Sequence, residues 1–123
     1  MDKLGKGAFG EVFVAQEKNL GWMCVIKKMS KKRIREAKVE EHIIREIKLQ
    51  TYLNHSHLTA LYGYFHDEDH LYLILELLPD GSLQQVKKKR KLPEKEATDI
   101  VRQVAEGLKY MHEEYVIHRD LKP

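Results

Sequence analysis

The sequence predicts an α+β fold in which an antiparallel sheet is followed mainly by helices. Alternating apolar residues over 11–17 and 22–29 predict two strands, and the turn signal Asn19-Leu20-Gly21 between them predicts a hairpin. Apolar residues at helical spacing after residue 39, and again after residue 93, predict two longer helices. Strand periodicity therefore dominates the first part of the chain and helical periodicity dominates the last part.

The remaining elements of the first part follow from the same periodicities. A short strand is expected just before Gly5, where the chain offers it only about three residues. Two more strands are expected at 60–65 and 71–76, joined by the acidic turn 67–69. The first long helix is expected to end at 54–57, and its common face is formed by Val39, Ile43, Glu46, Gln50 and Leu53.

A change in composition at residues 77–92 predicts a boundary between two lobes. There, an apolar strand gives way to a polar, lysine-rich stretch in which Ser82 can cap a short helix. Pro93 fits the first turn of the last helix, and Glu94 and Glu96 suit its positive end. The apolar stripe of that helix consists of Ile100, Val104, Leu108 and Met111.

The composition is that of one globular domain. The 123 residues are 42% hydrophobic and 33% charged, and no apolar run approaches the roughly 20 residues that cross a bilayer. The N-terminal residues contain no secretory signal, and the single cysteine, Cys24, is expected to be a small buried apolar residue. One cysteine cannot form an internal disulfide, so we expect cytoplasm or nucleus and no membrane partner.

The net charge of +3 is concentrated in two basic clusters. The first runs through Lys27, Lys28, Lys31, Lys32, Arg33 and Arg35, and the second is 87–91, Lys-Lys-Lys-Arg-Lys. A solvated helix end with its loop is the simplest interpretation. A nuclear-import patch or a patch for an acidic partner is the alternative. Nothing in the sequence suggests specific recognition of nucleic acid.

Gly5, Gly7 and Gly10 form a Gly-x-Gly-x-x-Gly pattern that by itself fits several kinds of site, or a plain glycine turn. A dinucleotide site needs a helix after the glycines, whereas here residues 11–15 are strand-like. The Gly-Lys-Ser/Thr ending of a P-loop is absent. The glycines are therefore expected to form a hairpin lid whose N–H groups approach phosphate oxygens, because no Cβ blocks them.

Lys27 and Glu46 are charges at positions predicted to face inward. Burial of either charge alone is unfavourable, so the two side chains are expected to face each other as an ion pair. Lys28 is the alternative to Lys27, and a solvent-facing carboxylate is the alternative for Glu46.

The chain ends with His118-Arg119-Asp120-Leu121-Lys122-Pro123. In order with the glycine pattern and with 24–27, Cys-Val-Ile-Lys, this segment resembles the signature segments of protein kinases. Residues 62–67 and 71–76 are most similar to the Aurora family of serine/threonine kinases, with Polo-like and calcium/calmodulin-type kinases as the alternatives. The resemblance implies a partial kinase domain: an N-lobe at 1–76 (an antiparallel sheet plus one helix), a hinge at 77–81, and the start of the helical C-lobe at 82–123.

The resemblance also implies roles for individual residues. Lys27, held by Glu46, would contact the α- and β-phosphates of ATP, and the lysine directly after Ile26 is the one that matches the family. Asp120 would accept the proton of the substrate hydroxyl, and Lys122, which is typical of the serine/threonine branch, would contact the transferring phosphate. Val25 stands where kinases usually have Ala. The expected nucleotide-binding residues are Leu4, Gly5, Gly7, Gly10, Val12, Val25, Lys27, Glu46, Leu75, Glu76 and Leu78.

The implied activity is ATP- and Mg²⁺-dependent transfer of the γ-phosphoryl group to Ser or Thr hydroxyls of a protein substrate. The family's Mg²⁺ ligands, an asparagine and an Asp-Phe-Gly segment, are expected beyond Pro123. No metal ligand is therefore expected within 1–123, and the chain alone is expected to be inactive. The alternative function is a non-catalytic nucleotide-binding or interaction module.

Overall fold

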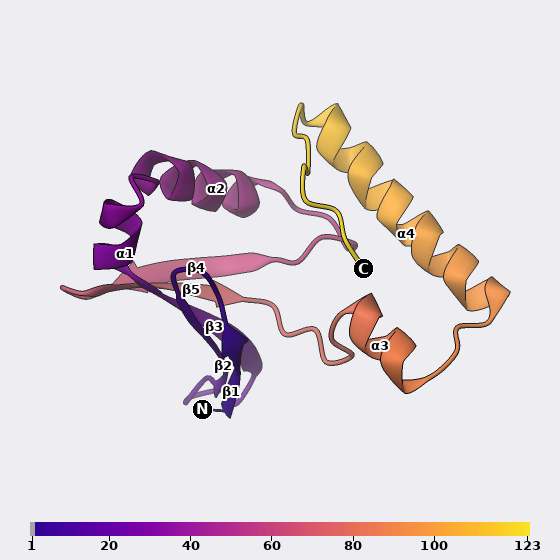
Figure 1. The fold of residues 1–123 in the computed structure, drawn as a ribbon, viewed down its shortest axis with the longest axis horizontal. Coiled ribbons are helices and arrows are strands. Elements are labelled where there is room, and N and C mark those ends of the chain that lie inside the picture. The colour runs from indigo at the N-terminus through magenta and orange to yellow at the C-terminus, as the bar shows by residue number, and fades with distance from the viewer. Residues whose placement is uncertain (1) are drawn as a thin grey trace. The chain divides into compact units, whose positions relative to one another are not determined.

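A computed structural model describes residues 2–123, which divide into two compact units (Figure 1). The first unit comprises the chain up to Asn54 together with Thr59–Leu77. The second unit comprises Leu78–Pro123 together with the loop His55–Leu58.

The first unit is built on a five-stranded sheet with the order β1-β2-β3-β5-β4, and every neighbouring pair is antiparallel. The strands are β1 (Asp2–Lys6), β2 (Gly10–Gln16), β3 (Met23–Ser30), β4 (Leu61–His66) and β5 (His70–Leu75). The predicted antiparallel α+β architecture is confirmed. β1 is longer than expected, because an irregularity between Lys3 and Gly5 lets it continue pairing beyond Leu4.

Two helices accompany this sheet, although only one was expected. α2 (Glu40–Tyr52) is the predicted helix, and α1 (Lys31–Glu36) is additional. α1 begins at this point because the Ser30 hydroxyl accepts a hydrogen bond from the Arg33 amide, at 3.3 Å. Figure 1 shows both helices over one face of the sheet.

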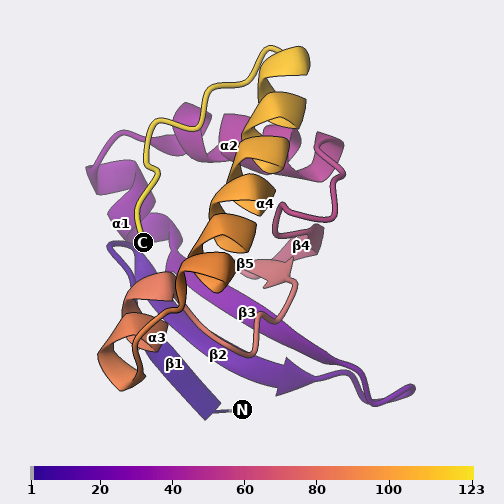
Figure 2. The same ribbon diagram turned by 90° about the vertical axis from the view of Figure 1, so that its right-hand side faces the viewer.

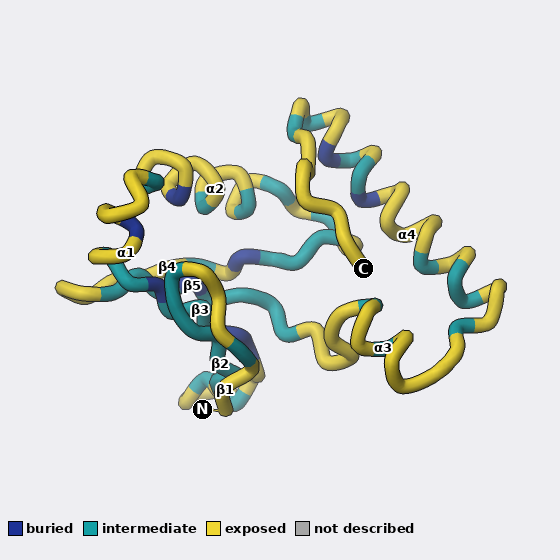
Figure 3. Tube along the Cα trace, in the orientation of Figure 1, coloured by how far each residue is buried: buried dark blue, intermediate teal, exposed yellow. Residues whose placement is uncertain are grey.

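The core lies between that face and the two helices. It consists of Met29, Ile34, Ile43, Leu61 and Leu73, with Phe9, Val39, Ile47, Leu71 and Leu75 packed against it. Figure 3 shows buried stretches along the strands and single buried turns in α1 and α2. Cys24 is 5% exposed, as predicted, and burial raises the pKa of its thiol.

The second unit contains α3 (Leu83–Lys89) and α4 (Glu94–Glu113), and Figure 2 shows α4 as one continuous helix. The predicted cap is confirmed, because Ser82 and Gln85 form a reciprocal capping box. Pro93 is the N-cap of α4 and so immediately precedes the first turn.

The loop His55–Leu58 packs against α4 through contacts that the sequence did not reveal. His57 Nε2 lies 3.1 Å from Glu106 Oε2, and the ring of His55 stacks on Tyr110 with 5.1 Å between centroids. Gly107 allows this approach, because a Cβ there would lie 3.3 Å from the His57 carbonyl oxygen. The α2–β4 connection is therefore part of the second unit.

The β4–β5 turn is organised by the carboxylate of Asp67. Its Oδ2 accepts a hydrogen bond from the Tyr72 hydroxyl at 2.7 Å, and its Oδ1 accepts from the amides of His70 and Asp69 at 2.7 and 2.9 Å. These bonds, that from Tyr72 foremost, lower the Asp67 pKa to about 2 from 3.8. Because the folded pKa is depressed, the carboxylate stabilises the fold above pH 3.8, and this contribution is lost as the pH falls towards about 2.

Replacement of Tyr72 by Phe should move the Asp67 pKa back towards 3.8, because the largest cause of the shift is removed. An NMR titration of the Asp67 side-chain carbon measures this directly. Tyr64→Phe is the control, because Tyr64 is an exposed tyrosine in the adjacent strand β4. An Asp67 pKa that is the same in Tyr72→Phe as in the unchanged protein would contradict the assignment.

Candidate functional site

The three glycines of the first motif lie in two different environments. A Cβ on Gly10 would lie 1.8 Å from the carbonyl oxygen of Lys28, so the close approach of β2 and β3 requires glycine there. A Cβ on Gly5 would meet nothing within 4 Å, and one on Gly7 would meet only the Gly10 oxygen, at 3.9 Å. Gly10 is thus needed by the sheet itself, whereas Gly5 and Gly7 leave backbone open for a ligand to approach.

The turn that joins β1 to β2 is fixed at both ends. The Gly7 amide donates to the Gly10 carbonyl at 2.7 Å, which closes the turn. The Ser30 amide donates to the Phe9 carbonyl at 2.8 Å, and the Phe9 side chain packs against the core. The glycine turn is therefore attached to the end of β3.

The strand register brings four of the predicted nucleotide-binding residues to one face of the sheet. Val12 lies opposite Lys27, and Val25 lies opposite Leu75. Residues opposite each other, and residues two apart in one strand, share a face, so Val12, Val25, Lys27 and Leu75 lie together. This is the face that carries Met29 and the core. Lys27 is half-buried, and it makes no ion pair with the part of the chain that the structure describes.

The structure does not bring Lys27 and Glu46 together. Glu46 Oε1 lies 2.9 Å from Nε2 of His42, one turn earlier in α2, and both side chains are more than 60% exposed, at 62% and 66%. The reason is the orientation of α2, whose covered side follows Ile43, Ile47 and Gln50. Glu46 lies at the border of that side, where His42 is within reach.

The segment after β5 is held by Glu76, whose side chain has a role that the sequence did not predict. Its amide donates to the Ala60 carbonyl, and its Oε2 accepts from the Ala60 amide, both at 3.0 Å. The carboxylate thus fixes the path of the chain directly after β5. Leu4 and Leu78 are 57% and 53% exposed.

In the second unit the structure brings Asp120 and Lys122 together. Lys122 Nζ lies 3.3 Å from Asp120 Oδ2, and both side chains are largely exposed. The Asp120 amide donates to His118 Nδ1 at 3.1 Å, and Arg119 between them has a φ of 67°. The left-handed backbone conformation of Arg119 turns the chain back, so that the His118 ring accepts the hydrogen bond from the Asp120 amide.

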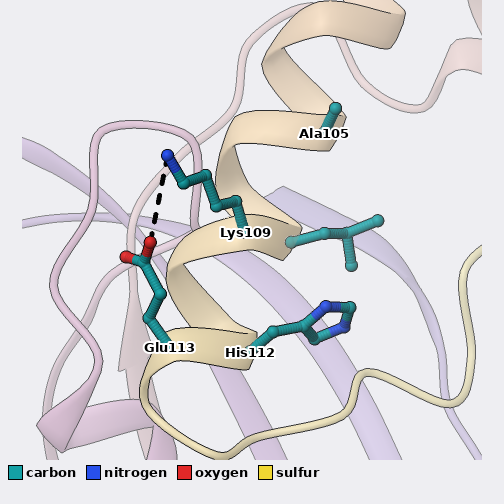
Figure 4. A pocket seen from close by; sticks show the side chains of 5 residues that line it. Ala105, Lys109, His112 and Glu113 are labelled. Atoms are coloured by element: carbon teal, nitrogen blue, oxygen red, sulfur yellow. Dashed lines mark ion pairs between the residues drawn. The ribbon is translucent and has the colours of Figure 1, made fainter.

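Residues 2–123 contain no group of three or more His, Cys, Asp or Glu side chains suited to a metal ion. None of the helices described is long and apolar enough to span a membrane. A pocket of about 550 Å³ lies along α4 and is lined by Ala105, Leu108, Lys109, His112 and Glu113 (Figure 4). It contains none of the predicted site residues.

The glycine turn, the lysine of β3 and the His-Arg-Asp loop, on this fold, are the parts of a protein kinase. The profile of the protein kinase domain matches residues 1–123, and the chain belongs to the protein kinase family.

Its relatives include Aurora kinases, which confirms the predicted similarity. The chain is 41% identical to the Aurora kinase of Schizosaccharomyces pombe over 121 residues, covering 98% of this chain and 34% of that protein. It is 40% identical to Aurora kinase B of Mus musculus over 121 residues, covering 98% of this chain and 35% of that protein. The chain therefore spans about a third of the length of these relatives.

Replacement of Gly10 by Ala should lower the free energy of unfolding by about 1–3 kcal/mol, because β2 must move away from β3. Gly7→Ala is the matched control and should change stability far less, because its Cβ meets only an ordinary contact. Urea unfolding followed by circular dichroism measures both. Equal stability of the two variants would contradict the assignment of Gly10 to the sheet.

Proposed function

We propose that this chain forms the nucleotide-binding part and the start of the catalytic loop of an ATP-dependent protein serine/threonine kinase of the Aurora type. The observation that supports this most strongly is the register of β2, β3 and β5. It puts Lys27, which has no ion-pair partner among residues 2–123, on the same face as the apolar Val12, Val25 and Leu75, next to a glycine turn. A cation beside an apolar surface and an open backbone suits a ligand with an aromatic base and phosphates.

In this proposal, each part of ATP has a complementary group among residues 5–78. Phosphate oxygens approach the backbone of the turn where Gly5 and Gly7 carry no Cβ, and Lys27 neutralises the α- and β-phosphates. Val12 and Val25 contact the adenine, while Leu75 limits the depth of the pocket. Backbone groups of Glu76 and Leu78 bind the adenine edge. ATP supplies the γ-phosphoryl group, and Mg²⁺ would neutralise its charge when bound.

The catalytic loop provides the proton acceptor. Asp120 accepts the proton of a Ser or Thr hydroxyl, and the hydrogen bond of its amide to His118 orients it. Lys122, whose Nζ lies 3.3 Å from Asp120 Oδ2, contacts the transferred phosphate in this proposal. Protein substrates with Ser or Thr are the partners of this reaction, in the cytoplasm or the nucleus.

Lys27 and Glu46 pair when nucleotide is bound, in this proposal, after Glu46 leaves His42. The exchange is small in energy, because an exposed ion pair contributes about 0–1 kcal/mol. The domain boundaries of the proposal are an N-lobe at 1–76, a hinge at 77–81 and the start of the C-lobe at 82–123.

The activity is tested in a chimaera in which residues 1–123 replace the matching segment of the S. pombe Aurora kinase. It should phosphorylate a serine peptide, and Asp120→Asn should lower kcat by about a hundred- to ten-thousand-fold, because the proton acceptor is lost. Asp99→Asn, on the exposed side of α4, is the matched control and should retain activity. A chimaera that binds ATP without phosphorylating peptide would instead support a non-catalytic nucleotide-binding module.

Replacement of His42 by Ala should raise the affinity for a fluorescent ATP analogue by up to about fivefold, because it releases Glu46. Lys48→Ala, an exposed substitution in the same helix, is the control. In a Glu46→Gln background the His42 substitution should have no effect on affinity. The same gain with and without the Glu46 carboxylate would refute the competition between His42 and Lys27.

A further inference from the structure

The basic segment Lys87–Lys91, at the end of α3, is not used by the proposed kinase chemistry. All five side chains are exposed. The guanidinium of Arg90 forms two hydrogen bonds to the carboxylate of Glu96, one of them with 2.8 Å between Nη1 and Oε2. These bonds, and to a smaller extent the negative charge of Asp80, raise the pKa of Arg90. No carboxylate in residues 2–123 lies within ion-pair distance of the four lysines, Lys87, Lys88, Lys89 and Lys91.

A solvated helix end does not account for the whole segment. Cations in the last turn of a helix are favourable by about 0.3–1 kcal/mol each, which suits Lys87–Lys89. Arg90 and Lys91, however, lie beyond the last helical residue and are also positively charged. The effect of the helix dipole falls off within the last turn, so it does not explain why the basic run continues to Lys91.

The segment can become extended at small cost. α3 has seven residues and buries none of them, and its capping box holds only the opposite end. Arg90 is already extended, with φ −157° and ψ 160°, and Pro93 prevents the helix from continuing. The last turn, Lys87–Lys89, must unwind and Arg90 must leave Glu96. The ends of short exposed helices open readily, and an exposed ion pair contributes only about 0–1 kcal/mol.

The geometry of the two conformations distinguishes the possible partners. On a helix, consecutive side chains differ by about 100°, so Lys87–Lys89 point in different directions and do not share a flat anionic surface. In an extended segment the side chains alternate, so a groove with carboxylates on both walls contacts all five. A bilayer or a duplex would contact fewer of them.

We propose that Lys87–Lys91 is a linear nuclear-import signal, bound in extended form by the acidic peptide groove of an import receptor. Short runs rich in Lys and Arg are typical of such signals. The proposal is independent of the kinase activity, because it uses none of the nucleotide-binding or catalytic residues.

The 123-residue chain, fused to a fluorescent protein too large to diffuse through nuclear pores, tests this in permeabilised cells. Added cytosol and ATP should produce accumulation in the nucleus several-fold above the bath, and excess free peptide 84–93 should abolish it. The triple variant Lys87→Gln, Lys88→Gln, Lys89→Gln should stay outside. The triple variant to Arg should enter, because the charge is kept.

The control removes the same charge from α1, by Lys32→Gln, Arg33→Gln and Arg35→Gln, and should be imported normally. Equal import of the two Gln variants would overturn the proposal. So would nuclear accumulation without cytosol, which indicates retention by nucleic acid. Binding to vesicles of phosphatidylcholine and phosphatidylserine in equal parts, lost in the variant of Lys87–Lys89 while import persists, would assign the segment to a membrane instead.

Discussion

The pairing of β2 with β3 is the constraint on which the rest of the first unit depends. At Gly10 the two backbones approach so closely that a Cβ would overlap the Lys28 carbonyl. The hydrogen bond from Ser30 to Phe9 fixes the same end of the pair. A slip of one residue would move Lys27 to the opposite face of the sheet, because side chains alternate. The position of this lysine therefore follows from a contact that involves no charge.

The same strand also determines where the core forms. Alternate residues of β3 direct Val25, Lys27 and Met29 to the face covered by α1 and α2. Met29 is 2% exposed and lies in the core, whereas Lys27 is only half-buried. Solvent exposure thus increases along β3 from Met29 to Lys27. Burying a cation without a partner is costly, so a lysine that is to bind a phosphorylated ligand has to remain partly accessible.

Periodicity predicted most of the fold because the strands and the longer helices each bury a face. It missed α1, because the six residues of this helix, Lys31–Glu36, include only one apolar residue, Ile34. It missed the anchoring of the His55–Leu58 loop, because His57, Glu106 and Gly107 are far apart in sequence. The positions of Val12, Val25, Lys27 and Leu75 were predictable, because the motif order fixes their strands and alternation fixes their face.

Glu46 shows where sequence reasoning about charge is weakest. The stripe that includes it was read as inward-facing, but a helical stripe has borders, and a residue there can turn to either side. Its partner is then decided by interactions of about 0–1 kcal/mol, such as the pair with His42. The strand register thus fixes the face on which Lys27 lies, whereas the partner of Glu46 depends on such weak, exposed interactions.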